Sequence, residues 1–250
     1  MEEGENSEPV IAVKALRKSF GDQTVLNGID LAVAQGETLA ILGRSGTGKS
    51  VLLKLIIGLQ KPDSGSIRIH GQETTGLPLD ALNEVRKKVG FLFQYAALYD
   101  SLTVGENVAF PLERHTRLSA AARKERVREL LSSVGMEQDL EKMPSQISGG
   151  MQKRVGLARA LALEPDILLF DEPTAGLDPI TAREIGELIL RLQEQRKKAC
   201  IVVTHDIPNA KTVSDRLALM HAGDILVEGT FKDLQESPNE FVARFLRDAS

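Results

Sequence analysis

The sequence predicts an α/β protein built on a parallel β-sheet, and two kinds of pattern carry that prediction. Dense apolar runs typical of buried strands occur at ETLAILG (37–43), ILLFDE (167–172) and ACIVVTHD (199–206). Segments with apolar residues at helical spacing lie between these runs, beginning with VLLKLIIGL (51–59). Strands and helices that alternate at this spacing form βαβ units, whose strands are parallel.

The N-terminal segments predict a second, antiparallel sheet. VIAVKAL (10–16) and TVLNGIDLAV (24–33) alternate polar and apolar residues, which suits strands with one exposed face. The turn-like stretches GDQ and AQGE follow these segments. SGSIRIHG (64–71) adds another short strand with turns on both sides.

Residues 79–163 are mostly helical in pattern. Thr103 and Glu106 have capping-box spacing before a helix, and a later helix ends at Gly135. The helix that begins at GGM stops at Pro165. Beyond it we expect a strand at 167–172, helices at about 179–197 and 208–215, a strand at 199–206, two strands within 216–229 and an amphipathic helix at 241–249.

We predict one domain over residues 10–250, preceded by a mobile tail at 1–9. The tail, MEEGENSEP, is acidic and polar and is therefore no signal peptide. No apolar run approaches the length that spans a bilayer, so we expect a soluble cytoplasmic chain or one held at a membrane by a partner. The expected parts are a core at about 10–93 and 164–235, a helical insert at about 94–163 and a C-terminal helix at about 239–249.

Composition excludes some classes of function. The chain has 250 residues and a net charge of −4, so no overall basic field is present to hold nucleic acid. The basic runs at 123–126 and 196–198 are interpreted as solvated helix ends or faces. Cys200 is the single cysteine, which excludes a disulfide within the chain and predicts a buried thiol in a reducing compartment. His70, His115 and His221 match no motif and are expected to be ordinary surface or turn residues.

The segment after the first buried strand fits the phosphate-binding pattern G-x-x-x-x-G-K-[ST], with a strand before it and a helix after it. Glycines let backbone N–H groups turn around phosphate oxygens, and the helix N-terminus adds partial positive charge. Lys49 is expected to neutralise the β- and γ-phosphates of a nucleotide, and Ser50 to ligate Mg²⁺. A glycine-rich turn without a ligand is the alternative. The segment comprises Gly43, Arg44, Ser45, Gly46, Thr47, Gly48, Lys49 and Ser50.

Two acids end the strand ILLFDE. Asp171 is expected to reach the metal directly or through water, and Glu172 to polarise the attacking water as general base. A turn or a helix cap is the alternative for two acids at a strand end. The phosphate-binding pattern upstream favours the catalytic interpretation.

Together these segments resemble the nucleotide-binding subunit of an ATP-binding cassette (ABC) transporter, over nearly all of the chain. The resemblance implies a P-loop NTPase of the ABC ATPase type, with a RecA-like parallel core, an antiparallel β subdomain and a helical insert. It also implies that Phe20 stacks on adenine, that Gln94 reaches Mg²⁺ and senses the γ-phosphate, and that His205 contacts the γ-phosphate. A core aromatic on an edge strand is the alternative for Phe20.

The resemblance further implies an ATP-dependent homodimer. Ser148, Gly149 and Gly150 match the family's signature, whose helix covers the γ-phosphate of ATP bound to a second subunit, and Asp178 matches the D-loop. The Ser148 hydroxyl can donate a hydrogen bond, and N–H groups at the helix start face anionic oxygens. A capped helix start with a glycine bend is the alternative for SGG.

Met151 stands where the family's signature usually has glutamine. Methionine cannot hydrogen-bond well near the ribose, but the serine and the backbone donors do not depend on it, so we expect an active ATPase. SGGM followed by basic residues, together with ALYDSLTV, ENVAFPL and FDEPTAGLDPI, resembles the ATPases of Mce- and Mla-type bacterial phospholipid transporters. This resemblance implies phospholipid or another hydrophobic cargo and an Mce-type lipid-binding protein among the partners.

The segment at about 95–115 places apolar and aromatic residues on a loop-rich helical insert. Such residues pack inside the insert or are offered to a partner. The resemblance implies a partner: an integral-membrane permease whose short cytoplasmic helix enters a groove there. The chain would then lie at the cytoplasmic face of the bacterial inner membrane. The residues concerned are Tyr95, Leu98, Tyr99, Val104, Phe110 and Pro111.

Three alternatives remain at this point. One is the ATPase of a different ABC importer or exporter, for amino acids or drugs. Another is an ABC ATPase without a membrane partner, although the chain has no heptad run and no zinc-binding cysteines. The third is a nucleotide sensor that does not hydrolyse ATP, which the presence of Glu172 and His205 disfavours.

Overall fold

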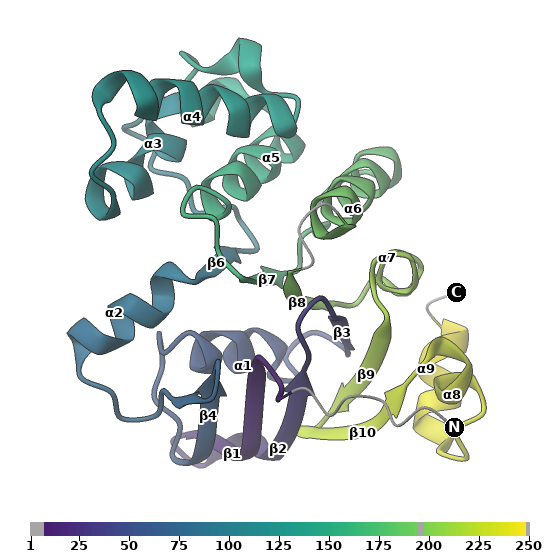
Figure 1. Cartoon of the computed structure of the whole chain (residues 1–250). Coiled ribbons are helices and arrows are strands. Elements are labelled where there is room, and N and C mark those ends of the chain that lie inside the picture. Colours follow the sequence, from purple (N-terminus) through teal and green to yellow (C-terminus); the bar gives the residue numbers. More distant parts are fainter. Residues whose placement is uncertain (1–7, 195–197, 249–250) are drawn as a thin grey trace, which may run out of the picture.

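A six-stranded sheet forms the centre of the computed structural model, which describes residues 8–194 and 198–248 (Figure 1). Its strand order is β10-β9-β3-β8-β7-β6. All neighbours are parallel except β10, which pairs antiparallel with β9 at the edge. The predicted parallel sheet is thus confirmed. Its strands are β3 (Thr38–Leu42), β6 (Val89–Leu92), β7 (Ile167–Asp171), β8 (Ala199–Thr204), β9 (Arg216–His221) and β10 (Asp224–Gly229).

Some expected features fall outside the described residues. These are residues 1–7 of the expected tail, residues 195–197 at the end of the expected helix and in the basic run, and residue 249 of the expected C-terminal helix. In the part of the chain that the structure does describe, no helix combines the length and the apolar composition needed to cross a bilayer.

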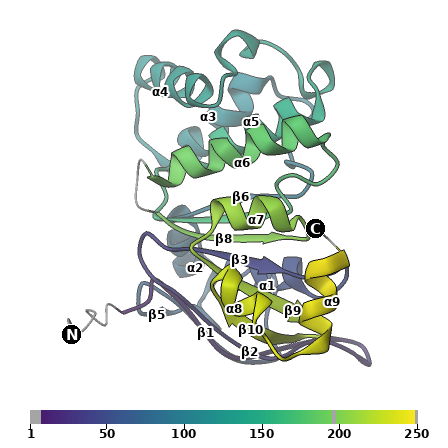
Figure 2. The ribbon, with the colours of Figure 1, turned by 90° about the vertical axis from the view of Figure 1, so that its right-hand side faces the viewer.

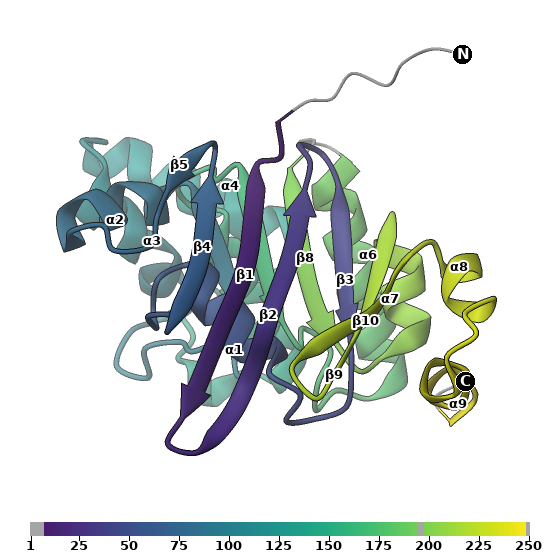
Figure 3. The same cartoon turned by 90° about the horizontal axis from the view of Figure 1, so that it is seen from below.

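The second sheet is antiparallel and has the order β2-β1-β4-β5. Figure 3 shows β4, β1 and β2 side by side in front of α1. Alternate residues of β1, β2 and β4 are buried, and they pack with the apolar face of α1 and with β3 in one hydrophobic cluster. The elements are β1 (Ile11–Phe20), β2 (Gln23–Val33), β4 (Ser64–Ile69), β5 (Gln72–Glu73) and α1 (Lys49–Ile56).

The helical region contains α3 (Val104–His115), α4 (Ala120–Ser133) and α5 (Gly149–Ala160), and it lies opposite the antiparallel sheet in Figure 1. The predicted capping box is confirmed, because Thr103 accepts from the Glu106 amide and Glu106 accepts from the Thr103 amide. The apolar residues of these helices and of α6 (Pro179–Glu194) form one cluster with residues of β6, β7 and β8. The helical region therefore shares one hydrophobic cluster with the central sheet. The bounds of the helical insert, about 94–163, stay a prediction.

The C-terminal helix α9 (Glu240–Asp248) packs on its own chain, as Figure 2 shows. Val242, Phe245 and Leu246 are buried in a cluster with residues of β3, β9, α7 (Ile207–Val213) and α8 (Phe231–Gln235). The structure also contains β5, α8, the helix α2 (Leu79–Lys87) and two 3₁₀ turns, η1 (Glu137–Asp139) and η2 (Pro144–Gln146).

Candidate nucleotide site

A glycine-rich loop joins β3 to α1 at the carboxyl end of the sheet. Gly46 and Gly48 have φ angles of 82° and 101°, a region that favours glycine. A Cβ atom at Gly43 would lie 2.6 Å from the carbonyl oxygen of Met220, so the loop also needs glycine for close packing. The loop therefore makes a tight turn, and the N-terminus of α1 faces the cavity that the loop lines.

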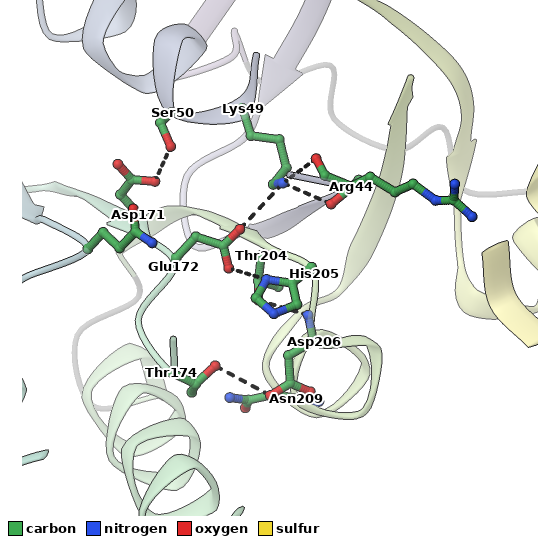
Figure 4. A network of polar contacts seen from close by, with 12 residues as sticks. Arg44, Lys49, Ser50, Asp171, Glu172, Thr174, Thr204, His205, Asp206 and Asn209 are labelled. Atoms are coloured by element: carbon green, nitrogen blue, oxygen red, sulfur yellow. Dashed lines mark hydrogen bonds and ion pairs between the residues drawn. The ribbon is translucent and has the colours of Figure 1, made fainter. Parts of the chain in front are cut away.

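Lys49, the first residue of α1, is buried with 4% exposure. Its Nζ atom donates to the carbonyl oxygens of Gly43 at 2.8 Å and Arg44 at 3.1 Å, and lies 3.4 Å from Oε1 of Glu172. The ammonium group is thus held between the glycine-rich loop and the end of β7. Figure 4 shows this arrangement, with the side chain of Arg44 pointing away from it.

Ser50 and Asp171 form an oxygen pair. The Ser50 hydroxyl donates to Oδ1 of Asp171 at 2.6 Å. Burial raises the pKa of Asp171, while the hydrogen bond from Ser50 and the charges of Lys54 and Lys49 oppose this rise. Among the described residues, no group of three or more histidine, cysteine or acidic side chains converges on a metal position. One carboxylate and one hydroxyl fit Mg²⁺, which usually keeps several waters and binds substrate phosphates.

Glu172 and His205 meet across two neighbouring strand ends. Oε2 of Glu172 lies 2.9 Å from Nδ1 of His205, which follows β8. A second link joins the same loops, because the Thr174 hydroxyl donates to Oδ2 of Asp206 at 3.3 Å. Asp206 also caps α7 by accepting from the Asn209 amide. The loop carrying the histidine is therefore fixed to the loop carrying the carboxylate (Figure 4).

A cavity of about 320 Å³ lies beside the glycine-rich loop. Phe20 at its edge is 47% exposed, so the alternative of a core aromatic is wrong for this residue. Gln94 comes from the turn after β6 and also lines the cavity. The structure therefore gathers these residues at one place. The predicted residues that line it are Phe20, Ser45, Gly46, Gly48, Lys49, Ser50, Gln94 and Glu172.

Four further predicted residues, Ser148, Gly149, Gly150 and Asp178, lie in a separate cluster at the starts of α5 and α6. Ser148 caps α5 by accepting from the Met151 amide at 3.3 Å, and both Ser148 and Gly149 are exposed. A Cβ atom at Gly150 would lie 2.5 Å from Cγ2 of Thr181 on α6. The hydroxyl of Thr181 hydrogen-bonds to Asp178 and, with backbone amides, lowers the pKa of that carboxyl. None of these residues lines the cavity at the glycine-rich loop.

Sequence reasoning missed Lys153, which is buried on α5 with 4% exposure. Its ammonium group donates to the carbonyl oxygens of Gln94 and, at 3.1 Å, of Glu172. Burial lowers the pKa of Lys153 to about 8, although the nearby carboxylates of Asp171 and Glu172 raise it. Helical spacing could have found it, because Lys153 lies three residues after Gly150 and four before Leu157, on the buried side of the helix.

Comparison with known proteins agrees with this geometry. Residues 26–175 match the family model described as ABC transporter. The chain therefore belongs to the ABC transporter family.

Individual relatives support the same assignment. The chain is 42% identical over 223 residues to the methionine import ATP-binding protein MetN of Brucella abortus, covering 89% of this chain and 60% of that protein. It is 41% identical over 236 residues to the "Probable ribonucleotide transport ATP-binding protein mkl" of Mycobacterium leprae, covering 94% of this chain and 68% of that protein. The chain thus spans less than two thirds of the length of the MetN relatives.

Two solved structures have a similar fold. The dimeric bacterial ABC transporter cassette MJ0796 has a TM-score of 0.83 at 37% identity, covering 88% of this chain and 98% of that one. The cbiO1 protein of Clostridium perfringens, part of the transporter complex cbiONQ, has a TM-score of 0.83 at 30% identity, covering 96% of each chain. The predicted fold, an ABC-type P-loop ATPase, is confirmed.

Proposed function

We propose that this chain binds Mg-ATP, hydrolyses it and uses the energy to drive a membrane permease. The observation that carries the proposal is a set of contacts beside one cavity: a buried lysine, a hydroxyl bonded to a carboxylate, and a second carboxylate that contacts both the lysine and a histidine. Lys49, Ser50 and Glu172 of this set line the cavity. Phosphoryl transfer to water needs charge neutralisation, metal binding and an oriented nucleophile, and this set contains a group for each. The residues are Lys49, Ser50, Asp171, Glu172 and His205.

Each residue has a distinct role in this proposal. Lys49 and the backbone N–H groups of residues 43–48 bind the β- and γ-phosphates, and the ring of Phe20 stacks on adenine. Glu172 accepts a proton from the attacking water, while His205 orients that carboxylate and contacts the γ-phosphate.

Ser50 and Asp171 would hold Mg²⁺, and Gln94 lies at the same cavity, where its side-chain oxygen can join them. The ion, when bound, neutralises charge that develops on the phosphate oxygens. The chain itself provides the oxygen atoms that would bind the ion and holds them in position. The 2.6 Å contact between Ser50 and Asp171 supports this role, because it brings the two oxygens together at the start of α1.

We infer an ATP-dependent homodimer from the second cluster. Ser148 and Asp178 are exposed at the starts of two helices, where donors and an acidic group can face another subunit. By accepting from the Met151 amide, Ser148 keeps its own hydroxyl hydrogen for an outside acceptor. In the dimer this hydroxyl and the N–H groups of Gly149 and Gly150 would cover the γ-phosphate of the partner's ATP.

A groove in the helical region supports a permease as partner. It has a volume of about 430 Å³ and is lined by Phe93, Tyr99, Phe110 and Pro111 among others. Tyr95 is 83% exposed nearby in the chain, whereas Val104 is fully buried and belongs to the core. We propose that a cytoplasmic helix of the permease binds this groove and holds residues 10–250, as a single domain, at the cytoplasmic face of the bacterial inner membrane.

For the cargo we propose phospholipid or another hydrophobic molecule, carried with an Mce-type lipid-binding protein. The support is the resemblance of SGGM and ALYDSLTV to the Mce and Mla group. A different importer is the second candidate, because relatives 42% identical to this chain are named for methionine import. The names of the relatives described above do not mention lipid.

The test is to isolate the tagged chain from detergent-solubilised native membranes and identify the associated proteins and lipids by mass spectrometry. A multi-spanning permease, a single-span Mce-type protein and enriched phospholipid support the lipid proposal. A permease with a soluble binding protein and no enriched lipid favours the importer. Absence of any permease would contradict both, and absence of Mg-ATP hydrolysis by the isolated complex would contradict the ATPase itself.

A further inference from the structure

The ammonium group of Lys153 joins the ends of two neighbouring strands of the central sheet. Gln94 follows β6 and Glu172 follows β7, and Lys153 donates to the main-chain carbonyl of each. Lys153 itself belongs to α5, the helix that Ser148 caps. One buried side chain thus connects that helix to the two residues proposed to face the γ-phosphate from this half of the dimer.

Both strand ends have backbone conformations that side chains disfavour. The φ angle is 47° at Glu172, 58° at Ala96 and 49° at Ala97, all in the left-handed region. Non-glycine residues keep such conformations only where surrounding contacts enforce them, and they concentrate at functional sites. Loss of the contacts that enforce them here would let Glu172 and Gln94 move from these positions.

Two side chains of α5, those of Lys153 and Arg159, contact these segments. Arg159, six residues after Lys153, donates to the carbonyl oxygen of Ala96 at 2.7 Å and to that of Ala97 at 2.8 Å. Arg159 therefore holds the second half of the turn after β6, whereas Lys153 holds its first residue and also Glu172. The two basic residues differ in one respect that an experiment can use: only Lys153 reaches the loop of the catalytic carboxylate.

We propose that Lys153 is a positioning residue for ATP hydrolysis, which fixes the main chain of Gln94 and Glu172 so that both side chains face the cavity. The inference rests on the proposed ATPase function. Lys153 touches neither phosphate nor metal in this proposal and acts only through the two carbonyl groups. Its removal should therefore change the rate of hydrolysis more than the affinity for ATP.

The first measurement compares hydrogen exchange in the full-length wild-type chain and in Lys153→Met, which keeps an unbranched side chain but lacks a donor. We expect the amides of residues 94–97 and those of Glu172, Thr174 and Ala175 within 172–175 to exchange about tenfold faster in the variant. Arg159→Met is the matched control, and it should speed exchange at 94–97 only. Equal exchange at 172–175 in wild type and Lys153→Met would overturn the proposal.

The second measurement separates binding from chemistry. In Lys153→Met we expect kcat to fall roughly 10- to 100-fold while the Kd for Mg-ATP changes less than about threefold. Lys153→Gln retains an N–H₂ donor and should recover part of the loss; equal defects in the Gln and Met variants would contradict a hydrogen-bonding role. A wild-type chain that neither binds nor hydrolyses Mg-ATP would refute the proposed function instead, and the exchange comparison, which needs no nucleotide, would still decide the role of Lys153.

Discussion

Nδ1 of His205 lies 2.9 Å from one carboxylate oxygen of Glu172, and the other oxygen of that carboxylate lies 3.4 Å from Nζ of Lys49. One acidic group therefore contacts both the first residue of α1 and the loop after β8. A phosphate bound at the loop competes with Glu172 for the lysine, because both are anions. We expect ATP binding to loosen the contact with Lys49 and to leave Glu172 with His205, in position to accept a proton from water.

Replacing Glu172 by glutamine tests this assignment. An amide keeps the shape but cannot accept the proton, so we expect kcat to fall by about 10²- to 10⁴-fold. Because the ATP-binding groups remain, Glu172→Gln should accumulate a dimer in Mg-ATP, measured by size-exclusion chromatography with light scattering. Hydrolysis at the wild-type rate would show that the base lies elsewhere.

Ser50→Ala tests the metal site. The variant loses the hydroxyl that contacts Asp171 at 2.6 Å, and we expect the Mg²⁺ concentration for half-maximal hydrolysis to rise roughly tenfold or more. Thr47→Ala is a control on the same loop, since the Thr47 hydroxyl donates to the Arg44 carbonyl and is not assigned to the metal. An unchanged Mg²⁺ requirement in Ser50→Ala would contradict the assignment.

Met151→Gln asks whether the unusual residue impairs hydrolysis. Only the main-chain amide of Met151 bonds to Ser148, and the side chain packs against the helical cluster. The bond persists in the variant, so kcat should stay within about threefold of wild type in steady-state assays. A large gain in kcat would show that methionine impairs the signature.

Asn107→Ala tests the region proposed to meet the permease. Asn107 is fully buried; its amide group donates to the carbonyls of Tyr99, Leu102 and Thr103 and its Oδ1 accepts from the Tyr99 amide. The variant removes these side-chain bonds; the carbonyls of Tyr99 and Thr103 keep main-chain donors, whereas the Tyr99 amide and the Leu102 carbonyl lose the acceptor or donor that Asn107 provides. We therefore expect the free energy of unfolding to fall by about 2–4 kcal/mol in urea titrations. Ser119→Ala, which removes an exposed helix cap, should cost about 1 kcal/mol or less. Equal costs would show that Asn107 does not organise the turn.

Motifs with an intrinsic physical signal could be predicted from the sequence. The strands β3, β7 and β8 are buried throughout and have apolar residues at all but one position each. The loop between β3 and α1 has glycines at the spacing of the phosphate-binding pattern. Thr103 and Glu106 have the spacing of a capping box, and they form that capping box at the start of α3.

Contacts between distant segments could not be predicted in this way. Lys153 binds main-chain carbonyls 59 and 19 residues away, and such acceptors are present at every position of a chain. His221 was expected to be an ordinary surface or turn residue, yet its ring stacks on Phe241 of α9 with centroids 3.8 Å apart. The five-residue α8 is too short for apolar spacing to reveal a helix.

Cys200 makes stability depend on pH in a defined window. Burial raises the pKa of its thiol to about 11 from 9.0, and the charged groups that act on it are Lys198, which lowers the pKa, and Asp215, which raises it. Between these two values the unfolded chain loses the thiol proton and the folded chain keeps it, so the free energy of unfolding falls as pH rises. We expect this thiol to contribute a loss of at most about 3 kcal/mol between pH 9 and 11, measured by urea unfolding. In Cys200→Ala this contribution to the fall in the free energy of unfolding between pH 9 and 11 should be absent. The difference in the free energy of unfolding between the variant and the wild type should be the same at pH 7 and pH 8. Parallel stability curves for the two proteins up to pH 11 would show that the thiol titrates normally in the folded chain.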